Sequence, residues 1–264
     1  MEIYNEKKDK IVLFENDFII SGGEANIYRK GNIIYKIQLD INKALTKSKL
    51  DELSVLSNDK RIILPQELVY NLSGQSIGFT MKYLDNTIRL ESLRDNNFKE
   101  THHISKNEVL EIIKEIQDLI EFIHSKDIIV VDLHKRNFLI DNKNFKKIYI
   151  IDTDSFQTKS FPTASIVKKI KDPYGKPYTT LTDWYSFAIL SFELLIGTHP
   201  FSGLHPEFKS TRYRMKHRKS LFNEEVEYPQ DAYNLEVIPE YLKNWFYSLF
   251  EEGKRSSPPK ILTT

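Results

Sequence analysis

Residues 128–140 read IIVVDLHKRNFLI and place Asp132 and Asn137 five positions apart in a polar loop between two apolar runs. A loop held between two short strands can keep polar side chains fixed above a buried floor. Aspartate accepts a proton or binds a metal, and asparagine offers a neutral oxygen ligand. Both residue types are also common in turns. This segment alone therefore leaves a plain turn and a catalytic loop as equal alternatives.

Length and composition describe a globular chain without a dominant charge. The 264 residues are 40% hydrophobic and 28% charged, and their formal net charge is +1. Such a chain can form one large domain or two lobes that share an interface. Because a balanced charge creates no general attraction to nucleic acids or membranes, neither is expected as a partner. The chain has no cysteine, which excludes disulfides and thiolate metal sites.

The N-terminal segment and the hydropathy of the chain indicate the cellular compartment of the protein. Residues 1–10 are polar and charged, so no signal peptide is expected. No apolar run approaches the roughly 20 residues that a membrane-spanning helix requires. A cytoplasmic protein is therefore expected, and the sequence leaves its oligomeric state open.

Residues 17–38 show a strand pattern that glycines interrupt. Gly22 and Gly23 lie between apolar runs, where free backbone N–H groups could meet phosphate oxygens. An ordinary hairpin turn is the alternative. Lys36 lies in the third apolar run of this region. A lysine there either extends to the surface or points into a site that pairs its charge.

The next segment, residues 40–57, has apolar residues at helical spacing and carries Asp51 and Glu52 in its second half. Asp51 is expected on a solvated face. For Glu52, a solvated position and a role as the charge partner of Lys36 remain equal alternatives. Strands are predicted at residues 67–70 and 76–83, with a boundary between two lobes near residues 81–86.

A long helix is predicted to begin after Ser105. Ser105 and Glu108 match a capping box, and apolar residues at helical spacing continue as far as Ile123. This helix delivers the chain directly to residues 128–140.

Two carboxylates follow the apolar strand predicted at residues 147–151. Burying Asp152 and Asp154 without partners would be unfavourable, so they face either water or a cation. Together with Asn137 on the neighbouring hairpin, they suggest a divalent metal site. Ligands that are all oxygen atoms favour Mg²⁺ or Mn²⁺ over zinc.

The remainder of the chain is predicted to contain two more helices. Residues 182–195 are apolar nearly all round and stop before Gly197, and residues 239–252 form the second helix. Residues 159–178 have the composition of a loop. The basic residues 209–219 are expected to form a solvated loop, and a docking surface for acidic or phosphorylated partners is the alternative.

Taken in order, these segments resemble the protein kinase superfamily over nearly the whole chain, and most of all divergent bacterial or phage members of the serine/threonine group. The resemblance implies an α+β fold with two lobes. Residues 1–84 would form a small antiparallel sheet with one main helix, and residues 85–264 a mostly helical lobe.

Later motifs match the family in part. Residues 183–201 resemble its D-x-W-S-x-G…G-x-x-P-F region, with Tyr185 at the tryptophan and Ala188 at the glycine. Asp172 begins the nearest match to the A-P-E motif, and Arg255 resembles the late arginine of the C-terminal lobe.

The resemblance also implies catalytic and nucleotide-binding roles. Asp132 is similar to the catalytic aspartate that orients the acceptor hydroxyl and accepts its proton. Lys36 resembles the lysine that orients the phosphates of ATP, and Glu52 resembles its helix partner. The implied nucleotide contacts, in the glycine-rich loop, the strand lysine and the hinge, are Gly22, Gly23, Glu24, Ala25, Ile27, Lys36, Met81, Lys82, Tyr83 and Leu84.

Two residues are implied as the ligands of Mg²⁺, with Mn²⁺ as the possible substitute. They are Asn137 and Asp152, and Asp154 is a competing candidate because Ser155 and Phe156 follow it.

The function implied is ATP- and Mg²⁺-dependent transfer of the γ-phosphoryl group to serine or threonine hydroxyls of proteins. Val130 and Val131 replace the usual His-Arg, whose arginine reads a phosphate on the activation loop. Activity without activation-loop phosphorylation is therefore expected. Because His134 completes an Asp-x-His-x-x-Asn pattern, a small-molecule phosphotransferase similar to aminoglycoside or choline kinases is the alternative. A pseudokinase acting as a binding module is a third possibility.

Overall fold

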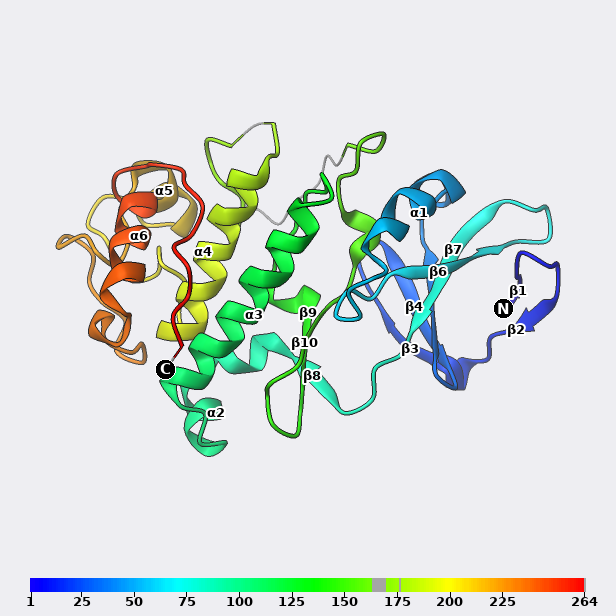
Figure 1. Cartoon of the computed structure of the whole chain (residues 1–264), viewed down its shortest axis with the longest axis horizontal. Coiled ribbons are helices and arrows are strands. Elements are labelled where there is room, and N and C mark those ends of the chain that lie inside the picture. The colour runs from blue at the N-terminus through cyan, green and yellow to red at the C-terminus, as the bar shows by residue number, and fades with distance from the viewer. Residues whose placement is uncertain (163–169, 176, 264) are drawn as a thin grey trace.

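The computed structural model describes residues 1–162, 170–175 and 177–263. The described chain divides into a part dominated by a β-sheet, which holds the N-terminus, and a mostly helical part, which holds the C-terminus (Figure 1). This is the α+β fold with two lobes that the sequence predicts. The loop predicted at residues 159–178 lies partly outside the described residues.

An antiparallel sheet of seven strands forms the first part. The three strands predicted around the glycines and Lys36 are confirmed, as are the two that follow them, whereas the first two strands of the chain were not predicted. In their order across the sheet, the strands are β2 (Lys10–Val12), β1 (Glu2–Tyr4), β6 (Pro65–Tyr70), β7 (Ser76–Lys82), β5 (Ile33–Gln38), β4 (Ala25–Lys30) and β3 (Phe18–Ser21).

The centre of this sheet holds Lys36 in a narrow space. Strands β5 and β7 pair so that Lys36 lies opposite Phe79 and Ile37 opposite Gly78. A Cβ atom on Gly78 would lie 2.1 Å from the carbonyl oxygen of Lys36. Glycine at this position therefore permits the close approach of the two strands, which fixes the backbone of Lys36.

The helix predicted at residues 40–57 is shorter than expected. Asp40 accepts a hydrogen bond from the backbone N–H of Asn42 and starts a separate 3₁₀ turn, Ile41–Lys43. Helix α1 (Lys47–Leu53) begins only at its cap, Thr46, and a further 3₁₀ turn follows it. Short polar side chains that bond to nearby backbone groups compete with a continuous helix, which explains the interruption.

Two long helices form the centre of the second part. Helix α3 (Lys106–His124) begins at the predicted capping box, where Glu108 N–H donates to Ser105 Oγ at 3.3 Å and Ser105 N–H donates to Glu108 at 2.7 Å. Helix α4 (Thr180–Ile196) is buried along nearly its whole length and ends at Gly197, whose φ is 88°. Helix α4 lies between α3 and α6 (Glu240–Phe250), as Figure 1 shows.

The basic stretch at residues 209–219 is largely exposed, as the sequence suggested, but part of it is a helix and not a loop. It contains helix α5 (Thr211–His217), in which Arg214 is buried. The Arg214 guanidinium donates to the carbonyl oxygens of Phe201 at 3.0 Å and Phe208 at 2.7 Å. These bonds satisfy a buried cation within the fold, so Arg214 is not available to a docking partner.

A second, three-stranded antiparallel sheet includes the end of the segment 128–140. Its strands are β8 (Thr87–Arg89), β9 (Phe138–Asp141) and β10 (Ile148–Ile150), and helix α2 (Asn96–Thr101) follows β8 in the chain. Strands β9 and β10 form a hairpin, with Asp132 and Asn137 before it and Asp152 after it. No helix among the described residues has the length and apolar character needed to cross a membrane.

Candidate active site

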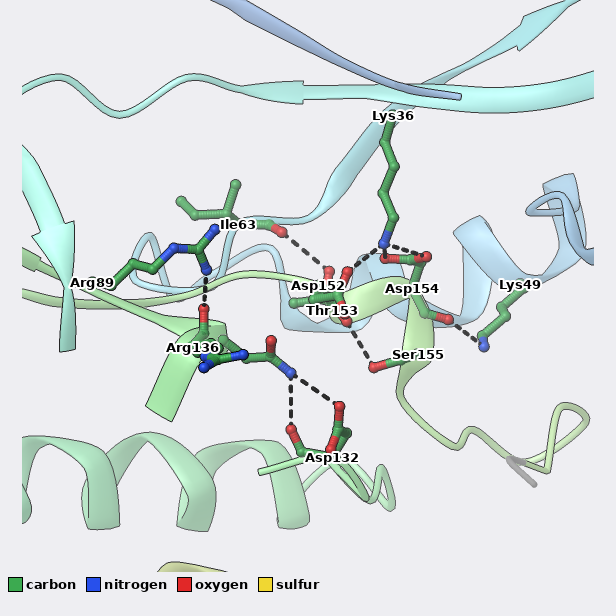
Figure 2. A network of polar contacts seen from close by, with 11 residues as sticks. Lys36, Lys49, Ile63, Arg89, Asp132, Arg136, Asp152, Thr153, Asp154 and Ser155 are labelled. Atoms are coloured by element: carbon green, nitrogen blue, oxygen red, sulfur yellow. Dashed lines mark hydrogen bonds and ion pairs between the residues drawn. The ribbon is translucent and has the colours of Figure 1, made fainter. Parts of the chain in front are cut away.

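Lys36 meets two carboxylates from the segment that follows β10. Its Nζ atom lies 2.9 and 3.0 Å from the two carboxylate oxygens of Asp154 and also donates to Asp152 (Figure 2). The Lys36 side chain is only 9% exposed, compared with 14% for Asp154 and 39% for Asp152. The fold therefore pairs a lysine of the first sheet with two acids that come more than a hundred residues later.

A tight turn aims both carboxylates at the same lysine. Asp152 adopts the left-handed backbone conformation, with φ 65° and ψ 32°, and a 3₁₀ turn over Thr153–Ser155 follows. The hydroxyl of Thr153 donates to the carbonyl oxygen of Ile63 at 3.1 Å, and that of Ser155 donates to the carbonyl oxygen of Asp152 at 2.8 Å. Aspartate is among the residues that tolerate this backbone conformation.

Burial and charge oppose each other in this cluster. Burial alone would lower the pKa of Lys36, but Asp154 and Asp152 outweigh it, so that pKa is raised. Burial raises the pKa of the Asp154 carboxyl and Asp152 adds to the rise, while Lys36 opposes it. An ammonium group that neighbours two carboxylates stays charged near neutral pH.

The loop before β9 is held in place by a buried carboxylate of helix α4. Asp183 of helix α4 is fully buried and accepts hydrogen bonds from the backbone N–H groups of Val130 at 2.7 Å and Val131 at 2.9 Å. His124 Nε2 lies 2.9 Å from the same carboxylate. Val131 has a φ of 65°, a strained conformation for a β-branched residue, which the surrounding bonds hold in place. Helix α4 thus fixes the backbone directly before Asp132.

Asp132 and Asn137 are in contact within the loop. The side-chain nitrogen of Asn137 donates to the carbonyl oxygen of Asp132 at 3.0 Å and to its carboxylate at 3.4 Å. This arrangement leaves the amide oxygen of Asn137 as the atom suited to a metal. His134 accepts a hydrogen bond from the Arg136 backbone N–H at 3.3 Å, and burial lowers the pKa of His134.

The expected pairing of Glu52 with Lys36 is not formed. The Glu52 carboxylate accepts a hydrogen bond from the Ser160 backbone N–H at 3.3 Å, and hydrogen bonds from Ser160 and Thr158 lower its pKa. The residue of α1 that faces the cluster is Lys49, whose Nζ donates to the carbonyl oxygen of Asp154 at 2.5 Å. Lys49 and Glu52 are three positions apart and lie on adjoining parts of one helix face, so the packing of this short helix decides which of them reaches the cluster.

The expected nucleotide-binding residues lie on the same sheet as Lys36. Gly22, Gly23 and Glu24 are exposed between β3 and β4, and Gly22 N–H donates to the carbonyl oxygen of Ala25 at 2.8 Å. On the neighbouring strand, Ile27 pairs with Lys36.

The segment expected to be the hinge lies where β7 ends. Met81 pairs with Ile34, Lys82 is exposed and Tyr83 N–H donates to the Asn32 carbonyl oxygen at 3.0 Å. Leu84 is half-buried. The two groups of expected nucleotide contacts thus lie at or beside the strands that flank β5, the first at the start of β4 and the second at the end of β7.

The donors near Lys36 suit a metal that a substrate helps to bind. No group of three or more His, Asp or Glu side chains among the described residues could hold a metal ion alone. Asp152 and Asn137 together offer carboxylate and amide oxygens. Mg²⁺ in phosphoryl-transfer sites is commonly held by one or two such side chains together with substrate phosphates, and this donor set fits that pattern.

Two ion pairs of the helical part of the chain were not predicted from the sequence. Lys135 Nζ lies 2.8 Å from both carboxylate oxygens of Glu193, and both side chains are buried. Arg255 meets Asp172 through two bonds of 2.5 and 2.7 Å. For Glu193 a signal existed, since a carboxylate within a helix that is apolar nearly all round requires a cation.

Comparison with known proteins supports the resemblance. The protein kinase domain family matches residues 36–262. The chain is 25% identical over 213 residues to the serine/threonine/tyrosine-protein kinase HT1 of Arabidopsis thaliana, covering 74% of this chain and 53% of HT1. It is 24% identical over 233 residues to the probable serine/threonine-protein kinase PknB of Lactococcus lactis, covering 82% of this chain and 36% of PknB.

A third relative and a solved structure extend the comparison. Over 117 residues the chain is 32% identical to the cAMP-dependent protein kinase type 3 of Saccharomyces cerevisiae, covering 42% of this chain and 26% of that kinase. It thus spans about half or less of these relatives. The Cydia pomonella granulovirus kinase PK-1 superposes with a TM-score of 0.64 at 16% identity, covering 89% of this chain and 88% of PK-1. The matched family covers most of the chain, which therefore belongs to the protein kinase domain family.

Proposed function

We propose that this chain transfers the γ-phosphoryl group of ATP to serine or threonine hydroxyls of proteins, with Mg²⁺ as its metal. The observation that carries the proposal is the hairpin of β9 and β10. Asp132 and Asn137 lie before it, and Asp152, bonded to Lys36, lies after it. Phosphoryl transfer depends on positioning and charge stabilisation, and these are the groups that it requires. The names of the relatives support serine and threonine as acceptors.

Each of these residues has a proposed task. Lys36 orients the phosphates, and Asp132 orients the acceptor hydroxyl and accepts its proton. Asp152 and Asn137 would hold Mg²⁺, or Mn²⁺ in its place. When bound, the metal neutralises charge on the phosphate oxygens. Residues 1–84 and 85–264 are proposed as the two lobes of the kinase domain.

The segments around Lys36 are proposed to bind the nucleotide. Gly22, Gly23, Glu24, Ala25 and Ile27 would cover the phosphates, because two adjacent glycines let the backbone approach a ligand closely. The backbone of Met81, Lys82, Tyr83 and Leu84 would hold the adenine.

Activity is proposed to be independent of phosphorylation on the activation loop. Val130 and Val131 are buried, and their backbone amides bind Asp183. This anchor supports a loop that is fixed without a phosphate. Treatment with a phosphatase should therefore leave the transfer rate unchanged, and a large loss of rate would refute this part of the proposal.

The bonds of His134 give no support to the small-molecule alternative. Its ring accepts a backbone hydrogen bond within the same loop, so a local structural role accounts for it.

The main test is transfer of label from [γ-³²P]ATP to generic protein substrates and, in parallel, to a panel of aminoglycosides and choline. The wild type should label protein, with Asp132→Asn slower by about 10³-fold because the group that orients the hydroxyl is lost. Asp118→Asn, at a half-buried acid on α3 that pairs with Lys114, serves as the matched control. Labelling of a metabolite alone would favour the small-molecule phosphotransferase. Equal rates for wild type and Asp132→Asn would favour a binding module.

A further inference from the structure

We propose that Asp154, and not Glu52 of helix α1, is the residue that positions Lys36. The segment after β10 would then supply both the lysine's partner and, in Asp152, the metal ligand. This inference rests on the proposed function, because positioning matters only if Lys36 orients phosphates.

The two acids contact Lys36 in different ways. Asp154 presents both carboxylate oxygens to Nζ, at 2.9 and 3.0 Å, and its side chain is 14% exposed. Asp152 bonds Nζ through one oxygen only, and its side chain is 39% exposed. A two-pronged, enclosed contact restricts the ammonium more than a single open one. Asp152 is the acid with surface left for a metal and phosphates.

Helix α1 cannot supply the partner in this arrangement, because it presents a cation. Lys49 lies on its site-facing side and donates to the Asp154 carbonyl oxygen at 2.5 Å, while Glu52 bonds Ser160. A second ammonium group near Lys36 repels it and cannot pair with it. Lys49 instead binds the backbone of the residue that does pair with Lys36. Helix α1 thus contributes to the position of Lys36 through the backbone of Asp154.

The turn that carries Asp154 has its own supports. Thr153 and Ser155 bond the backbone of Ile63 and Asp152, respectively. The position of Lys36 therefore depends on a turn that is held on both sides of Asp154 by bonds that do not involve α1.

The first experiment measures thermal unfolding without nucleotide or metal, so it does not depend on activity. Lys36→Met leaves two carboxylates without their cation and should lower the melting temperature by roughly 6 °C or more. In the double variant, Asp154→Asn should recover at least about half of the lost melting temperature, because it removes the repulsion between the two carboxylates. Glu52→Gln combined with Lys36→Met is the comparison and should restore nothing. Restoration by Glu52→Gln and none by Asp154→Asn would overturn the proposal.

The second experiment tests positioning through rates, well below the melting temperature. Asp154→Asn should lower kcat/KM for ATP by about tenfold or more in the wild type, but by less than about twofold in the Lys36→Met background. Glu52→Gln should change kcat/KM by less than about twofold. Equal effects of Asp154→Asn in both backgrounds would overturn the proposal.

Binding of Mn²⁺ to the enzyme–nucleotide complex, followed by electron paramagnetic resonance, separates Asp154 from Asp152. Asp152→Asn should weaken Mn²⁺ binding by roughly tenfold or more, and Asp154→Asn by less than about twofold. Equal weakening by both would make Asp154 a metal ligand and overturn the proposal. If Lys36→Met/Asp154→Asn recovers its melting temperature but neither the wild type nor any variant transfers the phosphoryl group, the proposed function is refuted and the Lys36–Asp154 ion pair is supported.

Discussion

Lys36 and Lys135 are two lysines buried to nearly the same degree, yet their partners differ. Their side chains are 9% and 10% exposed. Lys36 is shared by Asp152 and Asp154, whereas both bonds of Lys135 go to the single carboxylate of Glu193. Arg94 lies 3.7 Å from Glu193 and adds positive charge there. The pKa of Lys36 is raised despite its burial, whereas burial lowers the pKa of Lys135 and Glu193 only partly offsets it.

The difference indicates which pair is available for chemistry. Glu193 is 6% exposed, and both of its oxygens are used by Lys135, so this pair is closed. In the other cluster, two acids compete for one ammonium group and Asp152 remains 39% exposed. A closed pair fixes structure, while an open cluster with a second carboxylate can accept a cation or release the lysine to a phosphate.

The largest predicted effect separates activity from stability at Asp152. Asp152→Asn should lower the phosphoryl-transfer rate by about 10³-fold, because an amide replaces the charged ligand proposed for Mg²⁺. Its melting temperature should stay near that of the wild type, since Asp154 still pairs with Lys36. Transfer rates and scanning calorimetry on the same preparation test both statements. If Asp152→Asn lost thermal stability in proportion to its loss of rate, the distinction between a closed structural pair and an open reactive cluster would not hold.

For Glu193 we predict a large loss of stability with a much smaller loss of activity. Glu193→Gln leaves the Lys135 ammonium buried without its counter-charge and should lower the free energy of unfolding by about 3 kcal/mol. Urea unfolding measures this, and the double variant Lys135→Met/Glu193→Gln should regain most of the loss. The transfer rate measured well below the melting temperature should fall far less than in Asp152→Asn. A rate loss as large as that of Asp152→Asn, with normal stability, would contradict the structural role assigned to this pair.

Local patterns account for what the sequence could predict. The capping box at Ser105 set the start of α3, and the near-continuous apolar run before Gly197 identified a buried α4. The spacing of Asp132 and Asn137 brought two polar groups into contact within one loop. In each case the determining contacts lie within a few residues of one another, where sequence spacing translates directly into geometry.

Orientation and long-range pairing could not be predicted in the same way. Whether Lys49 or Glu52 faces the site depends on where Thr46 starts helix α1 and on how that short helix packs. Lys135 and Glu193 are 58 residues apart, so no local pattern links them. Strands β1 and β2 have three residues each, too few for alternation to be recognised.

The smallest predicted effect concerns a third buried lysine, which extends the comparison to a bond with no carboxylate. Lys99 of α2 is 3% exposed, its Nζ donates to the Leu194 carbonyl oxygen at 2.7 Å, and it lies 4.9 Å from the ring centroid of Tyr233. Burial lowers the pKa of Lys99 from 10.5 to about 8, against the opposing charges of Asp95 and Glu100. Lys99, whose ammonium group bonds a carbonyl oxygen and not a carboxylate, is thus the most easily deprotonated of the three buried lysines.

This lowered pKa predicts a stability that rises with pH. Between pH 8 and 10.5 the unfolded chain keeps the Lys99 proton more often than the folded protein does, so raising the pH favours the folded state. From pH 7 to pH 9 the gain attributable to Lys99 should be about 1.3 kcal/mol. Urea unfolding of wild type and Lys99→Met at both pH values isolates it, because the variant lacks the titrating group and retains the others. If the free energy of unfolding changes equally with pH in both proteins, Lys99 keeps its proton in the folded state. A carbonyl oxygen and an aromatic ring then suffice to keep a buried ammonium group charged as firmly as a carboxylate does.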